Sequence, residues 1–189
     1  MIRHVTIITG MLIAATAVMY STAPIDRSAN RPDAQQLSQV VEEIEGLDAL
    51  RSGLAASFSG EPDATTFGQV CKPVGARMRE LAEETGWTIQ QLALKNRNPN
   101  NTLDPEAELI YRMMDDTPEI MGLWLRTEMV GNPGFRYYRR IVVEPTCLGC
   151  HGPRDGRPQF VKDGYPDDRA YNFEVGDLRG IYSAFIADQ

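Results

Sequence analysis

A Cys-x-x-Cys-His cluster in the C-terminal part of the chain constrains it more than any other feature. Cys147 and Cys150 lie three positions apart, and His151 follows the second cysteine directly. The chain of 189 residues contains only three cysteines and two histidines in all, and Cys71 is the remaining cysteine. The chemistry that uses two thiols and an imidazole at this spacing therefore decides what kind of site the fold must build.

Three kinds of chemistry use such a cluster. In covalent haem attachment each thiol is bonded to one haem vinyl group, and the adjacent histidine binds the iron. A Cys-x-x-Cys pair can also exchange between dithiol and disulfide, and Cys71 could complete a structural zinc site of three cysteines and one histidine. The neighbouring positions of Cys150 and His151 disfavour zinc, and a redox pair leaves His151 and Cys71 without a role. We therefore predict one covalently attached haem c.

The N-terminus is typical of an export signal. An apolar run from Val5 to about Met19 follows a short basic start, and no acidic residue appears before Asp26. We expect residues 1–23 to be a cleaved signal peptide or a retained membrane anchor, because a spanning helix needs ~17–25 residues. Both alternatives place the rest of the chain in the periplasm, either soluble or anchored to the inner membrane. That compartment agrees with covalent haem attachment, which takes place outside the cytoplasm.

The composition of the chain limits the kinds of molecule that it is expected to bind. The net charge of −7 disfavours a nucleic-acid partner, because neutralising phosphates needs a basic surface. The content of 42% hydrophobic and 24% charged residues is ordinary for a globular protein. After the export segment we predict a linker at residues 24–32 and a single domain at residues 33–189.

Hydrophobic periodicity predicts the elements of this domain. Helices are expected at about 32–57, 67–86 and 105–116, and strands at about 87–95, on both sides of a turn at 131–134, and at about 178–186. A loop rich in glycine, proline and aspartate follows the cysteine cluster. Helices precede a small antiparallel sheet in this order, which predicts an α+β fold rather than a parallel α/β fold.

Cys71 is an odd cysteine in an oxidising compartment once the other two are bonded to haem. It lies on the apolar stripe of the predicted second helix, where a cysteine can be a buried small hydrophobe. Pro73 either occupies the first turn of that helix or lies inside it beside Cys71. The residues alone leave open whether the second iron ligand is Cys71, water, no group at all, or one of the methionines Met78, Met113, Met114, Met121 and Met129.

Four segments carry a wider pattern: VCKPV, GWTIQQLALKNRNPNN, FRYYRRIVVEPTCLGCHG and YPDDRAYNFEVGDLRGIYSAFI. They run through most of the mature chain. The order of Arg97-Asn98-Pro99, the cysteine cluster and the GDLRG segment at 176–180 is more specific than the haem motif alone. On these residues the chain resembles the Tll-type haem-binding domains, a family of single-haem c-type cytochromes with a PAS-like fold.

The resemblance implies a PAS-like antiparallel sheet with N-terminal helices and a haem packed against the sheet. It also implies that His151 is the proximal iron ligand and Cys71 the distal one, a thiolate that lowers the reduction potential. Asn172 occupies a position where that family favours glycine. Candidates to pair with the haem propionates, or otherwise to be solvated surface arginines, are Arg97, Arg136, Arg139 and Arg140.

We expect an exported monohaem cytochrome rather than an enzyme, because an iron with two protein ligands has no open position for a substrate. The leading prediction is outer-sphere electron transfer with a redox partner protein, with no small-molecule substrate. The alternative is a periplasmic redox or gas sensor in which Cys71 is displaced, and structural zinc or dithiol exchange is more remote. No output region follows the last predicted strand, which favours a carrier. Residues 1–23 would provide any membrane association.

Overall fold

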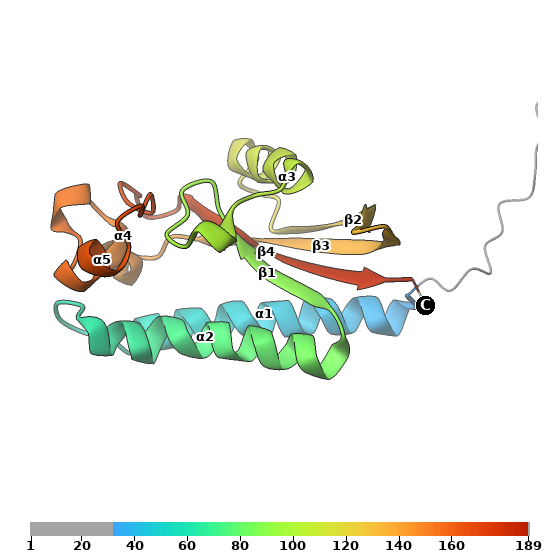
Figure 1. Ribbon diagram of the computed structural model, residues 1–189, viewed down its shortest axis with the longest axis horizontal. Coiled ribbons are helices and arrows are strands. Elements are labelled where there is room, and N and C mark those ends of the chain that lie inside the picture. The colour runs from blue at the N-terminus through green and yellow to red at the C-terminus, as the bar shows by residue number, and fades with distance from the viewer. Residues whose placement is uncertain (1–31, 189) are drawn as a thin grey trace, which may run out of the picture.

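A four-stranded antiparallel sheet forms the middle layer of the molecule (Figure 1). The structure is a computed structural model that describes residues 32–188, so the predicted export segment 1–23 and nearly all of the predicted linker 24–32 lie outside the described residues. Two long helices cover one face of the sheet and a third helix covers the other (Figure 1). The predicted α+β fold with an antiparallel sheet is confirmed.

The two long helices begin at aspartates and form where periodicity predicts them. Helix α1 spans Ala34–Ala56 and helix α2 spans Ala64–Thr85. At the start of α1 the carboxylate of Asp33 accepts a hydrogen bond of 2.8 Å from the backbone of Gln36, and Asp63 caps α2 in the same way. Pro73 therefore lies inside α2, which settles the two alternatives left open for this proline.

The sheet has the strand order β1-β4-β3-β2, and all neighbours are antiparallel. Its strands are β1 at Thr88–Leu92, β2 at Gly122–Met129, β3 at Asn132–Val142 and β4 at Leu178–Ala187. Each strand overlaps a predicted one. The last strand of the chain is thus an interior strand, paired with β1 on one side and β3 on the other.

The predicted hairpin is present, but its turn lies two residues earlier than predicted. The two turn residues are Val130, with φ of 52°, and Gly131, with φ of 79°, whereas Asn132 and Pro133 already belong to β3. Positive φ at both central residues gives the two-residue turn whose twist matches antiparallel strands. The predicted hairpin is confirmed and only the position of its turn was wrong, because Asn-Pro-Gly is common in turns, yet proline is also tolerated at the start of a strand.

Side-chain alternation along the sheet builds one core on each face. Tyr137 and Tyr138 are neighbours on β3, and because successive side chains point to opposite faces they enter different cores. Tyr137 packs with the side chains of α1 and α2, whereas Tyr138 packs against α3, Pro105–Asp116. Tyr182 and Ile181 on β4 divide in the same way.

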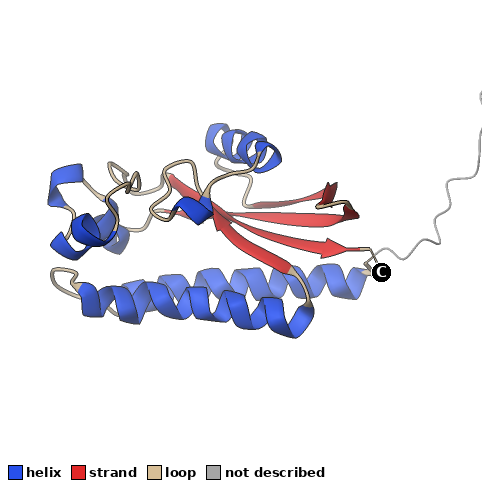
Figure 2. Cartoon of the chain, in the orientation of Figure 1, coloured by secondary structure: helices blue, strands red, loops and turns tan. Residues whose placement is uncertain are grey.

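The segment between β3 and β4 gathers at one end of these layers, beside the loop that joins α1 and α2 (Figures 1 and 2). It contains short helices that the sequence did not predict: η2 at Pro145–Cys147, α4 at Leu148–His151, η3 at Arg154–Gly156 and α5 at Gln159–Gly164. A small core of Val143, Ala170 and Phe173 supports the segment. Within residues 32–188, no helix has both the length and the apolar character needed to cross a membrane.

Replacing Gly134 on β3 tests how closely this strand packs against β4, and replacing Gly53 on helix α1 is the control. A Cβ at Gly134 would lie 2.6 Å from the Phe185 ring and closer still to the carbonyl oxygen of Ile186, whereas a Cβ at the helical Gly53 meets nothing within 4 Å. Gly134→Ala is expected to lower the free energy of unfolding by about 1–3 kcal/mol. Gly53→Ala is expected to raise it by about 0.5–1 kcal/mol. Urea denaturation measures both, and shifts of the same sign would contradict this packing.

Candidate cofactor-binding site

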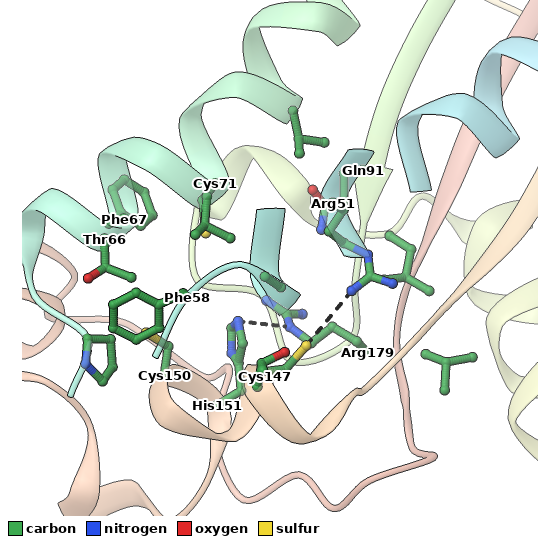
Figure 3. Close-up of a pocket in the computed structure, with 17 residues that line it drawn as sticks. Arg51, Phe58, Thr66, Phe67, Cys71, Gln91, Cys147, Cys150, His151 and Arg179 are labelled. Carbon is green, nitrogen blue, oxygen red and sulfur yellow. Dashed lines mark hydrogen bonds between the residues drawn. The ribbon is translucent and has the colours of Figure 1, made fainter. Parts of the chain in front are cut away.

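A cavity lies between the helical layer and the segment that carries the cysteine cluster (Figure 3). It has about 880 Å³ of empty volume, part of which is open to solvent. Its apolar walls come from α1, α2, their connecting loop and the end of β3: Ala55, Phe58, Pro62, Phe67, Val70, Val74, Ile141 and Val142.

The four site residues predicted from the sequence all line this cavity: Cys71, Cys147, Cys150 and His151. Cys71 comes from α2, and the other three come from η2 and α4 across the cavity (Figure 3). The fold thus brings the distant cysteine to the cluster. No disulfide bond joins any two of these three cysteines.

Backbone hydrogen bonds hold α4 against the chain that leads into β4. The amide of Phe173 donates to the carbonyl of His151 at 3.1 Å, and the amide of Asn172 donates to the carbonyl of Gly152 at 2.7 Å. Asn172 adopts φ of 56°, a left-handed conformation open to glycine and asparagine, which explains how asparagine replaces the glycine expected there. At Gly152 a Cβ would lie 2.6 Å from the carbonyl oxygen of Leu148, so this turn excludes larger residues.

The imidazole of His151 is held in one tautomer. Its Nδ1 lies 2.8 Å from the carbonyl oxygen of Ala170, and because a carbonyl only accepts, Nδ1 carries the proton. Nε2 therefore keeps its lone pair, which is the arrangement found in histidines that bind metals. Burial, together with the positive charges of Arg179 and Arg97, holds the pKa of His151 well below its usual value. The neutral form, which binds metals, is thus favoured.

The buried carboxylate of Asp168 organises the surroundings of His151. It accepts hydrogen bonds from Arg97 at 3.2 Å and Arg157 at 2.7 Å, and from the backbone amide of Ala170 at 2.9 Å. Arg97 in turn donates to the carbonyl oxygen of Cys150 at 2.7 Å. Asp168 therefore fixes both the residue whose carbonyl orients His151 and the arginine that holds α4.

Arg51 ties helix α1 to the cysteine segment. Its guanidinium pairs with Asp48 at 2.9 Å and with Glu144 at 3.0 Å, and one nitrogen lies 3.8 Å from the sulfur of Cys147. Ser52 also donates to Glu144. Sequence reasoning identified neither Arg51 nor Asp168 nor Arg179 as a site residue, although Asp168 and Arg179 both lie in the last of the four segments that carry the resemblance.

Three of the four arginines proposed as propionate partners lie elsewhere. Arg136, Arg139 and Arg140 do not line the cavity, and all three are buried rather than solvated. They sit on the interior strand β3, where the layers above and below exclude water and a buried charge needs a partner. Their partners are Asp104 and Glu106 for Arg136, Glu45 and Asp48 for Arg139, and the carbonyls of Met114 and Pro118 for Arg140. Arg97 does not line the cavity either, but it contacts Cys150 and His151, which do.

Cys71 faces the cavity from the middle of α2. Its side chain is exposed because the cavity is open, but the surrounding protein raises the pKa of its thiol, and the charge of Arg97 opposes this only in part. The thiol is therefore protonated until a cation stabilises the thiolate. Two residues later Pro73 has no N–H to donate, so the carbonyl of Gln69 lacks its helical partner close to Cys71.

Two alternatives to a haem with Cys71 as ligand have less support at this cavity: a methionine as the iron ligand, and a structural zinc ion. Among the described residues that line the cavity there is no methionine, and Met114, for example, lies in the core under α3. Within the described part of the chain, no three histidine, cysteine or carboxylate side chains come together as a metal-ion site. A pair of thiols, a neutral imidazole, a third thiol on the facing helix and apolar walls fit a haem better than a zinc ion.

The chain matches one family model and is similar to one solved structure of a haem protein. The family model described as Tll0287-like matches residues 22–187. A crystal structure of the cyanobacterial haem protein Tll0287 is similar, with a TM-score of 0.76 and 39% sequence identity, and the match covers 84% of this chain and 98% of that chain. No curated protein matches the chain.

Replacing Asp168 by asparagine tests the network around His151. Although burial raises the pKa of Asp168, the hydrogen bonds from Arg157 and Ala170 and the charge of Arg97 lower it overall. Asp168→Asn removes the negative charge from two arginines and is expected to lower the free energy of unfolding at pH 7 by about 2–3 kcal/mol.

The pH dependence provides a second readout of the same variant. Because the folded pKa of Asp168 is below the unfolded value, its stabilisation is present above about pH 4 and is lost as the pH falls through the folded pKa. The difference in unfolding free energy between the native protein and Asp168→Asn should therefore shrink below pH 4. Asp155→Asn, at an exposed position, is the control. A difference that stays constant with pH would contradict this role.

Proposed function

This chain belongs to the Tll0287-like family, and from that premise we propose that it is an exported monohaem cytochrome of the c type. Its role is outer-sphere electron transfer with a redox partner protein. The observation that carries the proposal is that Cys71 and the segment from Cys147 to His151 line a single cavity.

Three features of the chain support haem binding. The structurally similar protein Tll0287 is a haem protein. The cavity offers apolar walls to a porphyrin, and the paired cysteines at its floor are spaced for thioether bonds to two vinyl groups. His151 presents a neutral imidazole with Nε2 unprotonated, as an iron ligand requires.

The second iron ligand in this proposal is the thiolate of Cys71. Its helix faces α4 across the cavity, so Cys71 and His151 are the residues that would hold the iron of a haem there (Figure 3). A ferric ion would supply the positive charge that stabilises the thiolate against the burial that raises the pKa of the thiol. A thiolate ligand donates electron density to the iron, so a low reduction potential follows.

An iron that is bound by the protein on both faces has no position for a substrate, which favours electron transfer over catalysis. The predicted export segment 1–23 supports a periplasmic location, either soluble or anchored to the inner membrane. The acidic net charge of −7 favours a protein partner over nucleic acid.

Covalent attachment is tested by maturation in cells that attach haem to c-type cytochromes. The native chain should keep its haem through extraction with acidified acetone, because thioether bonds survive acid. The Cys147→Ser, Cys150→Ser double variant should release its haem into the solvent. The absorbance of the protein pellet measures both. Haem that leaves the native chain would exclude attachment through these cysteines.

Replacing Cys71 tests the distal ligand. Cys71→Ala should change the ferric absorption spectrum from low-spin towards high-spin, since the iron loses a strong axial ligand. Met78→Leu on the same helix is the matched control, because Met78 packs into the core between the helices and the sheet and should leave the spectrum unchanged. A Cys71→Ala spectrum identical to that of the native protein would assign Cys71 to packing alone.

A sensor is the second candidate function, and the weak point in α2 favours it. Pro73 cannot donate the regular helical hydrogen bond to the carbonyl of Gln69, which lies half a turn before Cys71, so this part of α2 can move with less loss of hydrogen bonding. Carbon monoxide separates the two functions. An electron carrier should not bind it in the ferrous state, whereas Cys71→Ala should bind it readily. Rapid binding to the native protein would favour the sensor.

A further inference from the structure

The guanidinium of Arg179 is the least compensated charge at the cavity. Arg51 is paired with Asp48 and Glu144, and Arg97 is paired with Asp168. For Arg179, by contrast, no carboxylate among residues 32–188 lies within 4.0 Å, although the side chain lines the cavity. The fold therefore directs one unneutralised cation into this space.

The hydrogen bonds of Arg179 are few for a group with five N–H donors. One terminal nitrogen donates to the carbonyl oxygen of Lys95 at 3.2 Å, and Nε donates to Nε2 of His151 at 3.5 Å. The guanidinium also lies 5.4 Å from the centre of the Phe173 ring. Burial and the charge of Arg97 lower the pKa of Arg179 to about 10, so it remains a cation at neutral pH.

The contact with His151 is incompatible with a bound iron. Nε2 has one lone pair, and an iron that binds it leaves nothing for Nε of Arg179 to donate to. The strand itself is fixed, because the next residue, Gly180, packs so closely that a Cβ there would lie 2.7 Å from the carbonyl oxygen of Leu92. Loading of the site therefore requires the side chain of Arg179 to take a new partner.

We propose that Arg179 exchanges partners when haem is loaded: it donates to His151 Nε2 in the haem-free chain and to a haem propionate in the loaded protein. This inference rests on the proposed haem site. A haem brings two carboxylates, and it enters a cavity where the other arginines already have carboxylate partners. A guanidinium binds a carboxylate through two parallel hydrogen bonds, which lysine cannot reproduce.

The exchange gives Arg179 one task in each state. Before haem arrives, its hydrogen bond to Nε2 and that of the Ala170 carbonyl to Nδ1 hold the imidazole from both sides. In the loaded protein the same cation neutralises a propionate. Without this partner, burying the propionate's charge in the low dielectric of the site would cost free energy. Arg179 is thus a positioning residue and the propionate anchor.

Resonance Raman spectroscopy of the haem-loaded protein tests the loaded state, because the bending mode of the propionates responds to their hydrogen bonds. Arg179→Met should shift this band, Arg179→Lys should shift it less, and the control Arg112→Met on α3 should leave it in place. Arg112 is exposed and paired with Glu108. If Arg179→Met yields no loaded protein, Arg179→Gln replaces it with the same expected shift.

The outcomes separate the two proposals. A propionate band that does not move in the Arg179 variants, in protein that carries covalent haem, would overturn the exchange and leave the cytochrome intact. Native protein without haem would overturn both.

Nitrogen NMR tests the haem-free state on the full chain. A His4→Gln background leaves His151 as the single histidine, since the chain has two. The Nε2 resonance should show an unprotonated nitrogen, and Arg179→Met should shift it whereas Arg112→Met should not. An Nε2 resonance that is indifferent to Arg179 would overturn the haem-free half of the exchange.

Discussion

The hydrogen bond between Nδ1 of His151 and the carbonyl oxygen of Ala170 is the interaction on which the proposed site depends. It places the proton on Nδ1 and leaves Nε2 available to a metal. The bond itself depends on Asp168, which binds the amide of Ala170 and pairs with Arg97 and Arg157. A carboxylate that never reaches the cavity thus decides which nitrogen of the imidazole faces it.

The fold provides the cavity itself, because side chains do not fill the space between the layers at one end of the molecule. The side chains of α1 and α2 pack on the sheet along most of its length, but beyond Val74 and Ile141 they line a cavity instead. The segment between β3 and β4 closes that end and carries both thiols and the imidazole. The long helix α2 belongs to both regions, so it presents Cys71 to the cavity while Leu81, further along, anchors it in the core.

Features with a local signal could be predicted from the sequence. Cys147, Cys150 and His151 are recognisable because they are neighbours, and the helices because their apolar residues recur at a fixed period. Cys71 stood out as an odd cysteine; the residues alone left open whether it binds the iron, and the resemblance favoured it.

Features that arise from tertiary contacts escaped prediction. Arg179 and Asp168 look like ordinary surface charges in the sequence, and only the fold places Arg179 at the cavity and buries Asp168. For the same reason Arg136, Arg139 and Arg140 could not be separated from Arg97 by sequence alone, since their acidic and carbonyl partners lie on other elements. The most direct test of the whole account is the electron paramagnetic resonance spectrum of the ferric protein. The account predicts one low-spin haem iron with a histidine and a thiolate as axial ligands. A high-spin spectrum, or a protein without iron, would contradict it.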